Sequence, residues 1–470
     1  MLDQGIISSV ELTQEFLNRS KKINPKINSV ISHTEEYAIK SAKEADEAIK
    51  DKKSKLLTGI PVMIKDNIST KNIETTAASK ILNGYIPPYD ATVIKNLLNE
   101  KAIICGKTNL DEFAMGSSTE NSSFGPVKNP LDLSKVPGGS SGGSAASVAA
   151  GQCVFALGSD TGGSIRQPAS FCGVIGMKPT YGLVSRFGLI AFGSSLDQIG
   201  PLSRNVEDCA RILNSISSFD EKDLTSLKRP FNNFGAKIGK SIKGLKIGIP
   251  KEYLVEGIES GVRIAYENSL KELEKSGAIL EEISLPLSEY ALAVYYIIAP
   301  AEASSNLSRY DGIKYGNFTD KAKNSIEHTL RSRGDGFGDE VKRRILLGTY
   351  VLSAGYYDAY YLKAQKVRTL IREEFQKAFN KFDAIVTPTT PNVAFNLNEK
   401  INSPYQMYLN DVCTIPVNIA GLPAISIPNG IDNNLPTGLH IIGPRMGDQT
   451  VIQIAHHYET ISQWKLKPKI

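Results

Sequence analysis

The sequence has 470 residues, of which 41% are hydrophobic and 22% charged, with a formal net charge of +5. This composition is that of a folded globular protein and argues against disorder. A charge this small, on scattered basic residues, argues against nucleic-acid binding by this chain alone. The five cysteines are odd in number and contain no Cys-x-x-Cys pair, which disfavours a disulfide framework and a structural zinc site. They are expected to be buried thiols in a reducing compartment.

The first fifty residues are expected to form two helices. Ser8-x-x-Glu11 and Ser32-x-x-Glu35 have the pattern of capping boxes at the two helix starts. No basic and apolar leader precedes the first of them. The longest uncharged run, 136–159, is interrupted by glycine and serine and fits a buried helix better than a membrane span. We therefore expect a cytoplasmic protein without membrane contact.

Short apolar segments then alternate with helical stretches. The helical stretches include Ser260–Lys275 and a long run over 341–379. Six segments bounded by glycine or proline are expected to be strands, at 59–68, 101–109, 244–250, 384–388, 424–428 and 438–444. Alternation of this kind predicts an α/β fold with a mixed or parallel sheet covered by helices on both faces.

The chain contains no fixed-period repeat and no low-complexity linker. The polar segment 219–242 is charged and poor in large aliphatic residues. It is the best candidate for a domain boundary or a surface excursion. We expect one domain over residues 1–470, with 1–50 as an N-terminal helical segment.

Two glycine-rich motifs could be assigned to common site types. Lys101 stands where a phosphate-binding loop ending in Gly106-Lys107-Thr108 requires its first glycine, so that match fails. The letters of a nucleophile elbow are present at 138–142 (GGSSG), but the preceding NPLDLSKVP is not an apolar strand. A serine esterase with Ser140 as nucleophile and His440 as base remains an alternative.

Taken together, the two glycine-serine clusters fit a nucleophilic site better. PGGSSGGSAASVAAG (137–151) places Ser140 before an alanine-rich helix, and GSDTGGSIR (158–166) places Ser164 after two glycines. Glycines permit dihedral angles that direct successive N–H groups at one point, as an oxyanion hole requires. The candidate donors are the N–H groups of Thr161, Gly162, Gly163 and Ser164. Each cluster alone could equally be a tight turn or a helix cap.

A base for this site is available at the end of the segment GIPVMIK (59–65). If Lys65 lies in apolar surroundings, its ammonium loses solvation, and lowering its pKa from about 10.4 to about 7 costs roughly 4–5 kcal/mol. The neutral amine could then accept a proton. A solvated surface charge is the ordinary alternative for a lysine after a strand.

The pattern from Lys65 through GGSSGGS (138–144) to GSDTGGSIRQPA (158–169) resembles the amidase signature family. Longer motifs over nearly the whole chain resemble the A subunits of tRNA-dependent amidotransferases within it. These motifs are KTNLDEFAMGSSTENS (107–122), MKPTYGLVSRFGLIAFGSSLDQIGPLSR (177–204), YDGIKYG (310–316), GDEVKRRILLGTYVLS (338–353), DVCTIPVNIAGLPAIS (411–426) and PTGLHIIGP (436–444). The resemblance implies the amidase signature fold, with a large central mixed β-sheet.

The resemblance also implies a Ser-cisSer-Lys triad. Ser164 would be the nucleophile, Ser140 the proton relay and Lys65 the base, with a cis peptide bond between Gly139 and Ser140. Ser164 would attack the side-chain amide of glutamine to form a glutamyl-enzyme ester.

Substrate-binding roles are implied for three further residues. Asp411 would bind the α-ammonium of glutamine and Arg344 its α-carboxylate, with Tyr295 close by. Tyr296 is the alternative to Tyr295, and an ion pair with Glu340 at i, i+4 is the alternative for Arg344.

Supporting or structural roles are expected for the two charged residues that flank Ser164 and for the five histidines. Asp160 and Arg166 are expected to support the site rather than to act chemically. No metal site is expected, because the five histidines show no grouping with carboxylates.

The family relationship further implies partners. This chain would supply ammonia and hold no cofactor, while a B subunit would bind the mischarged tRNA and use ATP and Mg²⁺, and a small C subunit would brace the pair. Two alternatives remain: a stand-alone amidase acting on another amide, and a catalytically idle scaffold subunit.

Overall fold

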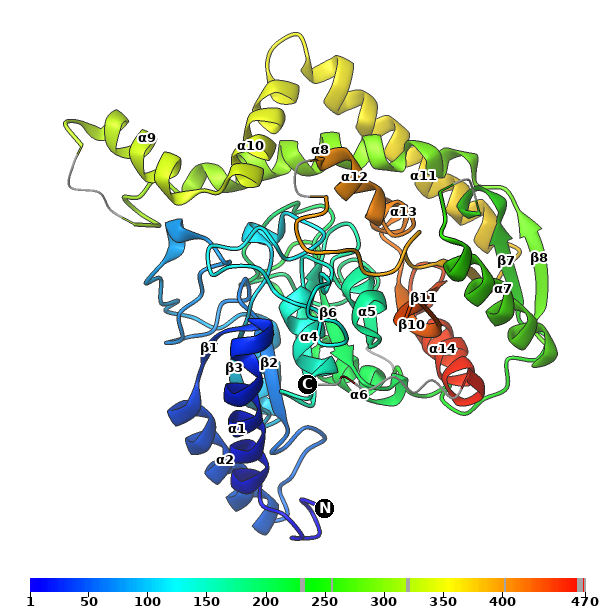
Figure 1. Cartoon of the computed structure of the whole chain (residues 1–470), viewed down its shortest axis with the longest axis horizontal. Coiled ribbons are helices and arrows are strands. Elements are labelled where there is room, and N and C mark those ends of the chain that lie inside the picture. The colour runs from blue at the N-terminus through cyan, green and yellow to red at the C-terminus, as the bar shows by residue number, and fades with distance from the viewer. Residues whose placement is uncertain (229–232, 255–256, 318–321, 401–402, 463–467, 469–470) are drawn as a thin grey trace.

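The computed structural model describes the whole chain except residues 229–232, 255–256, 318–321, 401–402, 463–467 and 469–470. An 11-stranded sheet runs through the described part, in the order β1-β3-β2-β4-β6-β5-β10-β11-β9-β7-β8 (Figure 1). The strands are β1 (Val30–His33), β2 (Pro61–Lys65), β3 (Ile103–Thr108), β4 (Phe155–Asp160), β5 (Ile175–Lys178), β6 (Gln198–Ser203), β7 (Lys246–Pro250), β8 (Ile279–Ile283), β9 (Ala384–Pro388), β10 (Ala424–Asp432) and β11 (Leu435–Ile442).

The sheet is mixed, as the sequence predicts. β2 lies parallel to β3 and β4, and β7 lies parallel to β8 and β9, whereas the other pairs are antiparallel. All six predicted strands are present, as β2, β3, β7, β9, β10 and β11. The sequence analysis missed the other five, which are four to six residues long. Length is not the cause, because the predicted strands β2, β7 and β9 have only five residues each. β4, for example, lies in the uncharged run that was expected to be a helix, and apolar runs do not distinguish the two.

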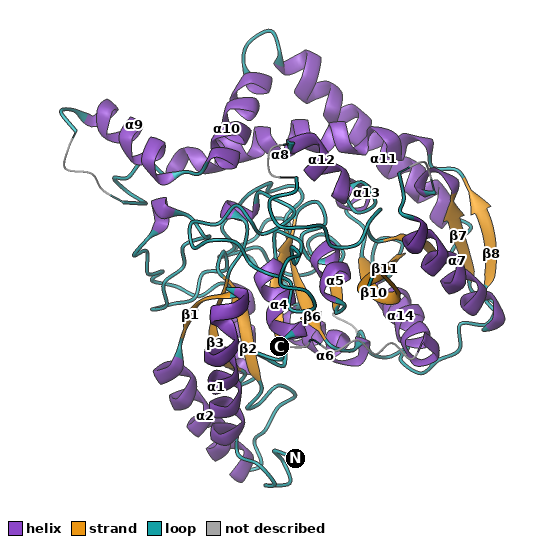
Figure 2. Cartoon of the chain, in the orientation of Figure 1, coloured by secondary structure: helices purple, strands orange, loops and turns teal. Residues whose placement is uncertain are grey.

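Helices cover both faces of the sheet (Figure 2). One hydrophobic core lies under α3, α6, α7 and α14, and two others lie on the opposite face under α1, α2 and α4 and under α8, α11 and α13. The helices are α1 (Ser9–Ile27), α2 (Glu35–Lys50), α3 (Thr92–Asn99), α4 (Gly142–Ala149), α5 (Arg166–Cys172), α6 (Val206–Ile216), α7 (Ser260–Lys275), α8 (Ala291–Asn306), α9 (Ser325–Gly336), α10 (Asp339–Leu352), α11 (Lys363–Phe379), α12 (Pro404–Tyr408), α13 (Ile415–Ala420) and α14 (Asp448–Ser462).

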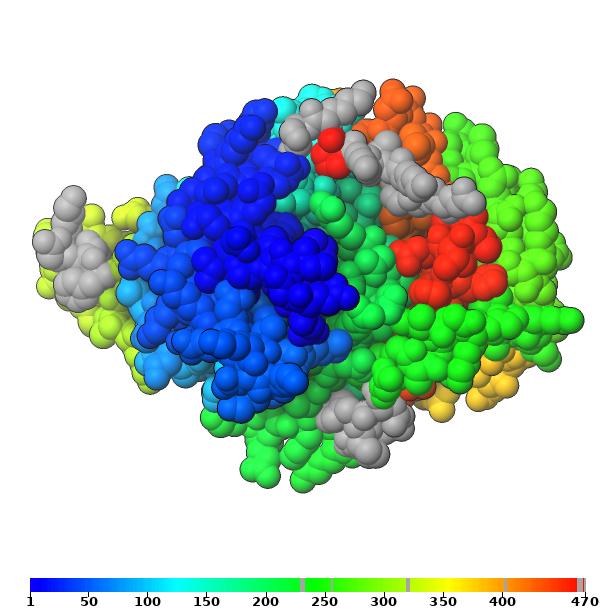
Figure 3. Space-filling model, turned by 90° about the horizontal axis from the view of Figure 1, so that it is seen from below, coloured from blue at the N-terminus to red at the C-terminus, as the bar shows by residue number. Residues whose placement is uncertain are grey.

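The two predicted N-terminal helices are confirmed, but only one of their predicted caps is. Ser8 and Glu11 form the capping box of α1. The second prediction is wrong, because Ser32 belongs to β1 and Thr34 stands at the N-cap of α2. Residues 30–33 pair antiparallel with β3 at the sheet edge, and this pairing outweighs the local capping signal. The N-terminal segment and α14 both reach the surface on the face seen in Figure 3.

Two long predicted helices are interrupted. The run 341–379 divides into α10 and α11, because Gly355 adopts a left-handed φ of +84° and a π-helical turn, Tyr357–Leu362, follows it. In the run 136–159 only residues 142–149 are helical, and Phe155 begins the buried strand β4. Continuous apolar runs do not distinguish a buried helix from a buried strand.

The segment 219–242, the candidate boundary, lies between α6 and β7, and its residues 229–232 fall outside the described part. Strands from before and after this segment belong to the same sheet. All five cysteines are buried and unpaired. Across the described residues, no helix has the length and apolar character needed to cross a membrane.

Candidate functional site

A buried lysine at the end of β2 is the centre of the site. Since side chains alternate along a strand, Lys65 points to the same face as Met63, the face that carries α4. Its Nζ donates hydrogen bonds to Ser140 Oγ at 2.7 Å, Ser141 Oγ at 2.8 Å and Ser159 Oγ at 3.0 Å. The lysine and the predicted relay serine are therefore in direct contact, although 75 residues separate them in sequence.

The surroundings of Lys65 favour its neutral form. Burial lowers the pKa of Lys65 to about 7, because the enclosed ammonium loses its hydration. The negative charges of Asp111, Asp160 and Asp197 partly oppose this shift. An amine with this pKa is available as a base above about pH 7.

Two of the serines that contact Lys65, Ser140 and Ser141, directly precede α4, and the third, Ser159, lies in β4. The peptide bond between Gly139 and Ser140 is cis, as the sequence predicts. The two positions before Ser140 must be glycine because neighbouring atoms lie too close for a side chain. A Cβ on Gly138 would lie 2.4 Å from Gln167 Oε1, and one on Gly139 would lie 2.1 Å from Asp111 Oδ2. No other residue fits this turn without displacing its neighbours.

Ser164 lies in the turn between β4 and α5. Its carbonyl oxygen accepts a hydrogen bond from the Ser141 N–H at 3.0 Å, which joins this turn to the start of α4. The residue is 7% exposed. Among the described residues, its hydroxyl has no hydrogen-bond partner, and the bond to Ser140 that a relay uses is not formed. In unliganded sites such bonds are commonly long and tighten when substrate binds.

The backbone of the Ser164 turn carries the N–H groups predicted to form the oxyanion hole. Gly163 N–H donates to Asp160 Oδ1 at 2.9 Å, so this predicted donor is already engaged. For the N–H groups of Thr161, Gly162 and Ser164, no acceptor is found within the described part of the chain. These three remain the open donors of the predicted oxyanion hole.

Asp160 and Arg166 support the turn from behind. They form a fully buried ion pair with a 2.9 Å contact, and Asp160 also accepts the N–H groups of Gly163 and Ile165. Although burial alone raises a carboxyl pKa, the guanidinium of Arg166 holds the pKa of Asp160 below its usual range. Asp160 is therefore a permanently charged anchor for the turn.

His440, the base that the esterase alternative requires, lies against Arg166 instead. Its Nε2 is 3.0 Å from Arg166 Nη1, and its Nδ1 is 3.2 Å from Thr387 Oγ1. Arginine only donates, so Nε2 accepts and the ring proton is on Nδ1. Burial lowers the pKa of His440 and keeps it neutral. Ser140 contacts Lys65, and His440 contacts Arg166 and Thr387. The interpretation as an esterase with His440 as the base of Ser140 is therefore wrong.

Asp411 reaches the Ser164 turn from the segment before α13. Ser117 Oγ donates to Asp411 Oδ2, whereas Asp411 Oδ1 is buried and has no partner in the described part. A Cβ on Gly163 would lie 3.3 Å from that oxygen. Burial raises the pKa of Asp411 to about 7. A buried, unpaired carboxylate oxygen is a place where a cationic group gains an ion pair.

Arg344 projects from α10 into a cage of aromatic rings. The rings of Phe192, Tyr296 and Tyr408 lie 5.5, 5.3 and 5.5 Å from its guanidinium carbon. Its Nε donates to Glu340 Oε1 at 2.8 Å. The predicted alternative, an ion pair with Glu340, therefore exists, but it is buried, since the Arg344 side chain is only 4% exposed. No described residue accepts a hydrogen bond from Nη1 or Nη2, the edge that could hold a carboxylate.

The two adjacent tyrosines of α8 line different parts of this space. A Cβ on Gly162 would lie 2.8 Å from Tyr295 Cζ, so the ring of Tyr295 packs on the Ser164 turn. Tyr296 instead stacks on Tyr408, with ring centroids 3.8 Å apart, and faces Arg344. Tyr295 is thus the one beside the nucleophile turn.

Several polar residues that order the site were not singled out from the sequence. Gln167 accepts the Gly139 N–H and donates to the Ser117 carbonyl oxygen, both at 2.9 Å. Ser141 and Ser159 surround Lys65 Nζ. Each lies within or beside a quoted motif, and a buried polar side chain next to a catalytic residue is the signal that could have identified it.

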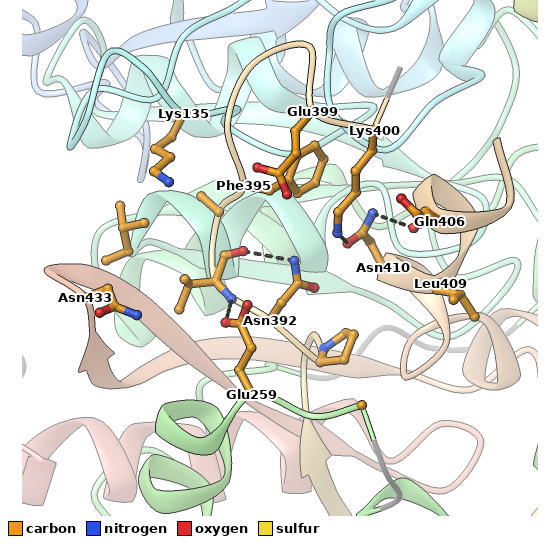
Figure 4. A pocket seen from close by; sticks show the side chains of 15 residues that line it. Lys135, Glu259, Asn392, Phe395, Glu399, Lys400, Gln406, Leu409, Asn410 and Asn433 are labelled. Carbon is orange, nitrogen blue, oxygen red and sulfur yellow. Dashed lines mark hydrogen bonds between the residues drawn. The ribbon is translucent and has the colours of Figure 1, made fainter. Parts of the chain in front are cut away.

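A separate open pocket lies outside this cluster (Figure 4). Lys135, Glu259, Glu399 and Lys400 line it, and none of the predicted site residues does. Lys400 Nζ donates to Asn410 Oδ1 at 2.9 Å, and Asn410 directly precedes Asp411 in the chain. The pocket therefore lies beside the segment that carries Asp411.

Comparison with known proteins identifies the family. A family model described as Amidase matches residues 11–452, which include every residue of the site described above. A protein of Thermoanaerobacter pseudethanolicus is 57% identical over 469 residues, covering 100% of this chain and 96% of that protein. The chain belongs to the amidase family. Its fold is the amidase signature fold, as the sequence predicts.

The proteins that resemble this chain include both tRNA-linked enzymes and other amidases. The T. pseudethanolicus protein is named as the A subunit of glutamyl-tRNA(Gln) amidotransferase, and so is a Coxiella burnetii protein, 56% identical over 99% of this chain and 96% of that protein. The crystal structure of the protein of that name from Thermotoga maritima has 45% identity, a TM-score of 0.82 and coverage of 98% and 95%. A peptide amidase from Stenotrophomonas maltophilia has 30% identity, a TM-score of 0.85 and coverage of 99% and 96%. The fold alone therefore does not select the substrate.

Proposed function

We propose that this chain is the glutamine-hydrolysing, ammonia-supplying A subunit of a tRNA-dependent amidotransferase. The observation that carries the proposal is that two groups of opposite charge type each have atoms without a partner among the described residues. They are Asp411 Oδ1, beside the Ser164 turn, and the Nη edge of Arg344, whose charge acts on Asp411. Glutamine carries an ammonium and a carboxylate that match them. Relatives that are 54% to 57% identical carry the name of this subunit, which supports the choice.

In the proposed reaction, the first step is nucleophilic attack. Neutral Lys65 Nζ accepts the proton of Ser140 Oγ, and Ser140 in turn takes the proton of Ser164. Ser164 Oγ then bonds to the side-chain carbonyl carbon of glutamine. The negative charge on the carbonyl oxygen is stabilised by the N–H groups of Thr161, Gly162 and Ser164.

The second half of the reaction releases ammonia and restores the enzyme. The carbon–nitrogen bond breaks as the proton held by Lys65 returns through Ser140 to the leaving nitrogen. A glutamyl ester of Ser164 remains. Water, deprotonated by the same lysine and serine pair, hydrolyses the ester to glutamate.

The proposal assigns tRNA chemistry to other chains. A B subunit would bind mischarged Glu-tRNA(Gln) or Asp-tRNA(Asn) and phosphorylate its carboxyl group with ATP and Mg²⁺, and a C subunit would brace the cytoplasmic heterotrimer. Ammonia would pass internally from Ser164 to the B subunit. The formal charge of +5 fits a chain that leaves the tRNA backbone to a partner.

Ammonia release from glutamine tests this proposal directly. The complex would be purified on a tag from its native host and assayed with and without ATP and Glu-tRNA. We expect release to rise when both are added. Release that is indifferent to both additions would contradict the assignment to a tRNA-dependent enzyme.

A stand-alone amidase is the second candidate, favoured by the likeness to the peptide amidase. Such an enzyme would leave Asp411 Oδ1 and the Nη groups of Arg344 without partners whenever an uncharged amide binds, which is costly for buried polar groups. A panel of simple aliphatic and aromatic amides distinguishes the two. Faster turnover of these amides than of glutamine would favour the stand-alone enzyme.

Arg344→Lys is expected to weaken glutamine binding with little effect on chemistry. The lysine offers one charged point and cannot hold Glu340 and a carboxylate with one planar group. We expect KM for glutamine to rise about 30-fold, equivalent to about 2 kcal/mol, and kcat to change less than about 3-fold. Arg343→Lys is the matched control, since Arg343 is exposed and also pairs with Glu340. An equal rise in both variants would count against the assigned role.

His440→Ala is expected to affect stability rather than catalysis. The variant removes a buried acceptor from Arg166 and opens a cavity beside it. We expect unfolding free energy to fall by about 2–4 kcal/mol in denaturant titration. Glutamine turnover by the folded protein should change less than about 10-fold. A loss of about 10³-fold in a protein of unchanged stability would revive a catalytic role for this histidine.

A further inference from the structure

Lys65 Nζ has more hydrogen-bond partners than a proton relay through Ser140 requires. Besides Ser140 Oγ at 2.7 Å, it lies 2.8 Å from Ser141 Oγ, 3.0 Å from Ser159 Oγ and 3.3 Å from the Ser159 carbonyl oxygen. A protonated amine has three N–H groups, but a neutral amine has two and one lone pair. The neighbours of the neutral amine therefore decide where its lone pair points.

The hydroxyl proton of Ser141 can be placed from its partners. Ser141 Oγ lies 3.0 Å from the Ser159 carbonyl oxygen, which only accepts, and 3.3 Å from the Ser159 N–H, which only donates. The single hydroxyl proton of Ser141 therefore points to the Ser159 carbonyl. The side of Oγ that faces Lys65 carries a lone pair and must receive an N–H from the lysine.

The position of Ser141 in the fold indicates that this contact is not a helix cap. Ser141 is the N-cap residue of α4, where a serine side chain ordinarily accepts a backbone N–H of the first turn. Here its side chain makes no capping hydrogen bond. The hydroxyl is turned instead toward Lys65 and Ser159, and it is fully buried there.

We propose that Ser141 is a positioning residue: its Oγ and the Ser159 carbonyl oxygen accept the two N–H groups of neutral Lys65, and this directs the amine lone pair at the Ser140 hydroxyl. The inference deepens the proposed function, because it concerns the same base. Without Ser141 the neutral amine gains rotational freedom, and its lone pair is directed at Ser140 only part of the time.

Ser141 also stabilises the protonated amine, which gives the proposal a second observable. The ammonium faces the carboxylates of Asp111, Asp160 and Asp197, and Ser141 supplies one of its acceptors. Loss of that acceptor disfavours the ammonium, so the pKa of Lys65 falls and the acid limb of the activity profile moves to lower pH. A role confined to folding would leave this limb in place.

The test uses Ser141→Ala in the intact complex, with two readouts. We expect kcat for glutamine to fall about 10- to 100-fold with KM within about 3-fold, and the acid limb to move to lower pH. The same shift is expected in the rate at which phenylmethylsulfonyl fluoride labels Ser164, confirmed by mass spectrometry with Ser164→Ala as the blank. Labelling does not depend on the amide substrate, so it tests the proposal even if glutamine proves not to be the substrate.

Ser144→Ala is the matched control. Ser144 is a buried serine on the same helix, and its hydroxyl bonds to Thr108 and the Leu157 carbonyl rather than to Lys65. We expect the control to keep its acid limb. Unchanged rates in Ser141→Ala, or a loss of rate with no shift of the limb, would overturn the proposal.

Discussion

Replacing Ser164 by alanine is expected to lower ammonia release from glutamine by at least about 10⁴-fold, which is the scale of losing the nucleophile of a serine hydrolase. The turn carries one other hydroxyl, that of Thr161, and it is engaged with Asp197 at 2.7 Å. Without Ser164 Oγ no covalent ester forms. The residual rate reports only what the N–H groups and the binding residues contribute to attack by water.

The amidation step provides the control for this variant. In a complex of the kind proposed, ammonium chloride added in excess replaces glutamine as the nitrogen source for the partner. Ser164→Ala should therefore still amidate Glu-tRNA(Gln) with added ammonium while failing with glutamine. If the variant releases ammonia from glutamine at more than about 1% of the wild-type rate, Ser164 is not the nucleophile.

The sequence singled out residues that the structure brings together, such as Lys65 and Ser140, whereas it missed several strands of the sheet around them. Lys65, Ser140 and Ser164 lie in glycine-rich or strand-end segments that single them out as candidates, because glycines at these positions indicate unusual backbone conformations or close contacts. Their individual roles come from the resemblance to the amidase signature family. β1, by contrast, has four residues, and its place in the sheet depends on pairing with β3, far along the chain. Local patterns do not contain that information.

The hydrogen-bond directions within the site could not be predicted from sequence either. Nothing in GGSSGGS (138–144) indicates that the Ser141 side chain faces Lys65 instead of capping α4. This orientation depends on a hydrogen bond to Ser159, which lies in β4. Similarly, the pairing of Arg344 with Glu340 follows from their i, i+4 spacing, but its burial among Phe192, Tyr296 and Tyr408 depends on three distant segments. Tertiary contacts decide which of two plausible roles a side chain takes.

Glutaminase activity is expected to fall steeply below about pH 7, because two groups must both lose a proton. Lys65, whose pKa is lowered to about 7, is a base only when neutral, and Asp411, whose pKa is raised to about 7, binds an ammonium only when ionised. Both active forms predominate above that pH. At about pH 5.5, kcat/KM should be about 10³-fold below its plateau, roughly 30-fold from each group. The decrease is measured from initial rates between about pH 5.5 and 9, with circular dichroism to confirm that the protein stays folded.

Asp411→Asn separates the two protonations. In the wild-type protein, the slope of log kcat/KM against pH should approach 2 on the acid side, since the profile of kcat/KM reports the groups of the free enzyme. The amide cannot titrate, so the variant has a lower plateau and a slope that approaches 1, which belongs to Lys65. Asp111 and Asp197, whose pKa values burial raises to about 6, are common to both proteins and cancel in the comparison. Equal slopes in the two proteins would show that Asp411 is ionised throughout, and the assignment of the second proton would then fail.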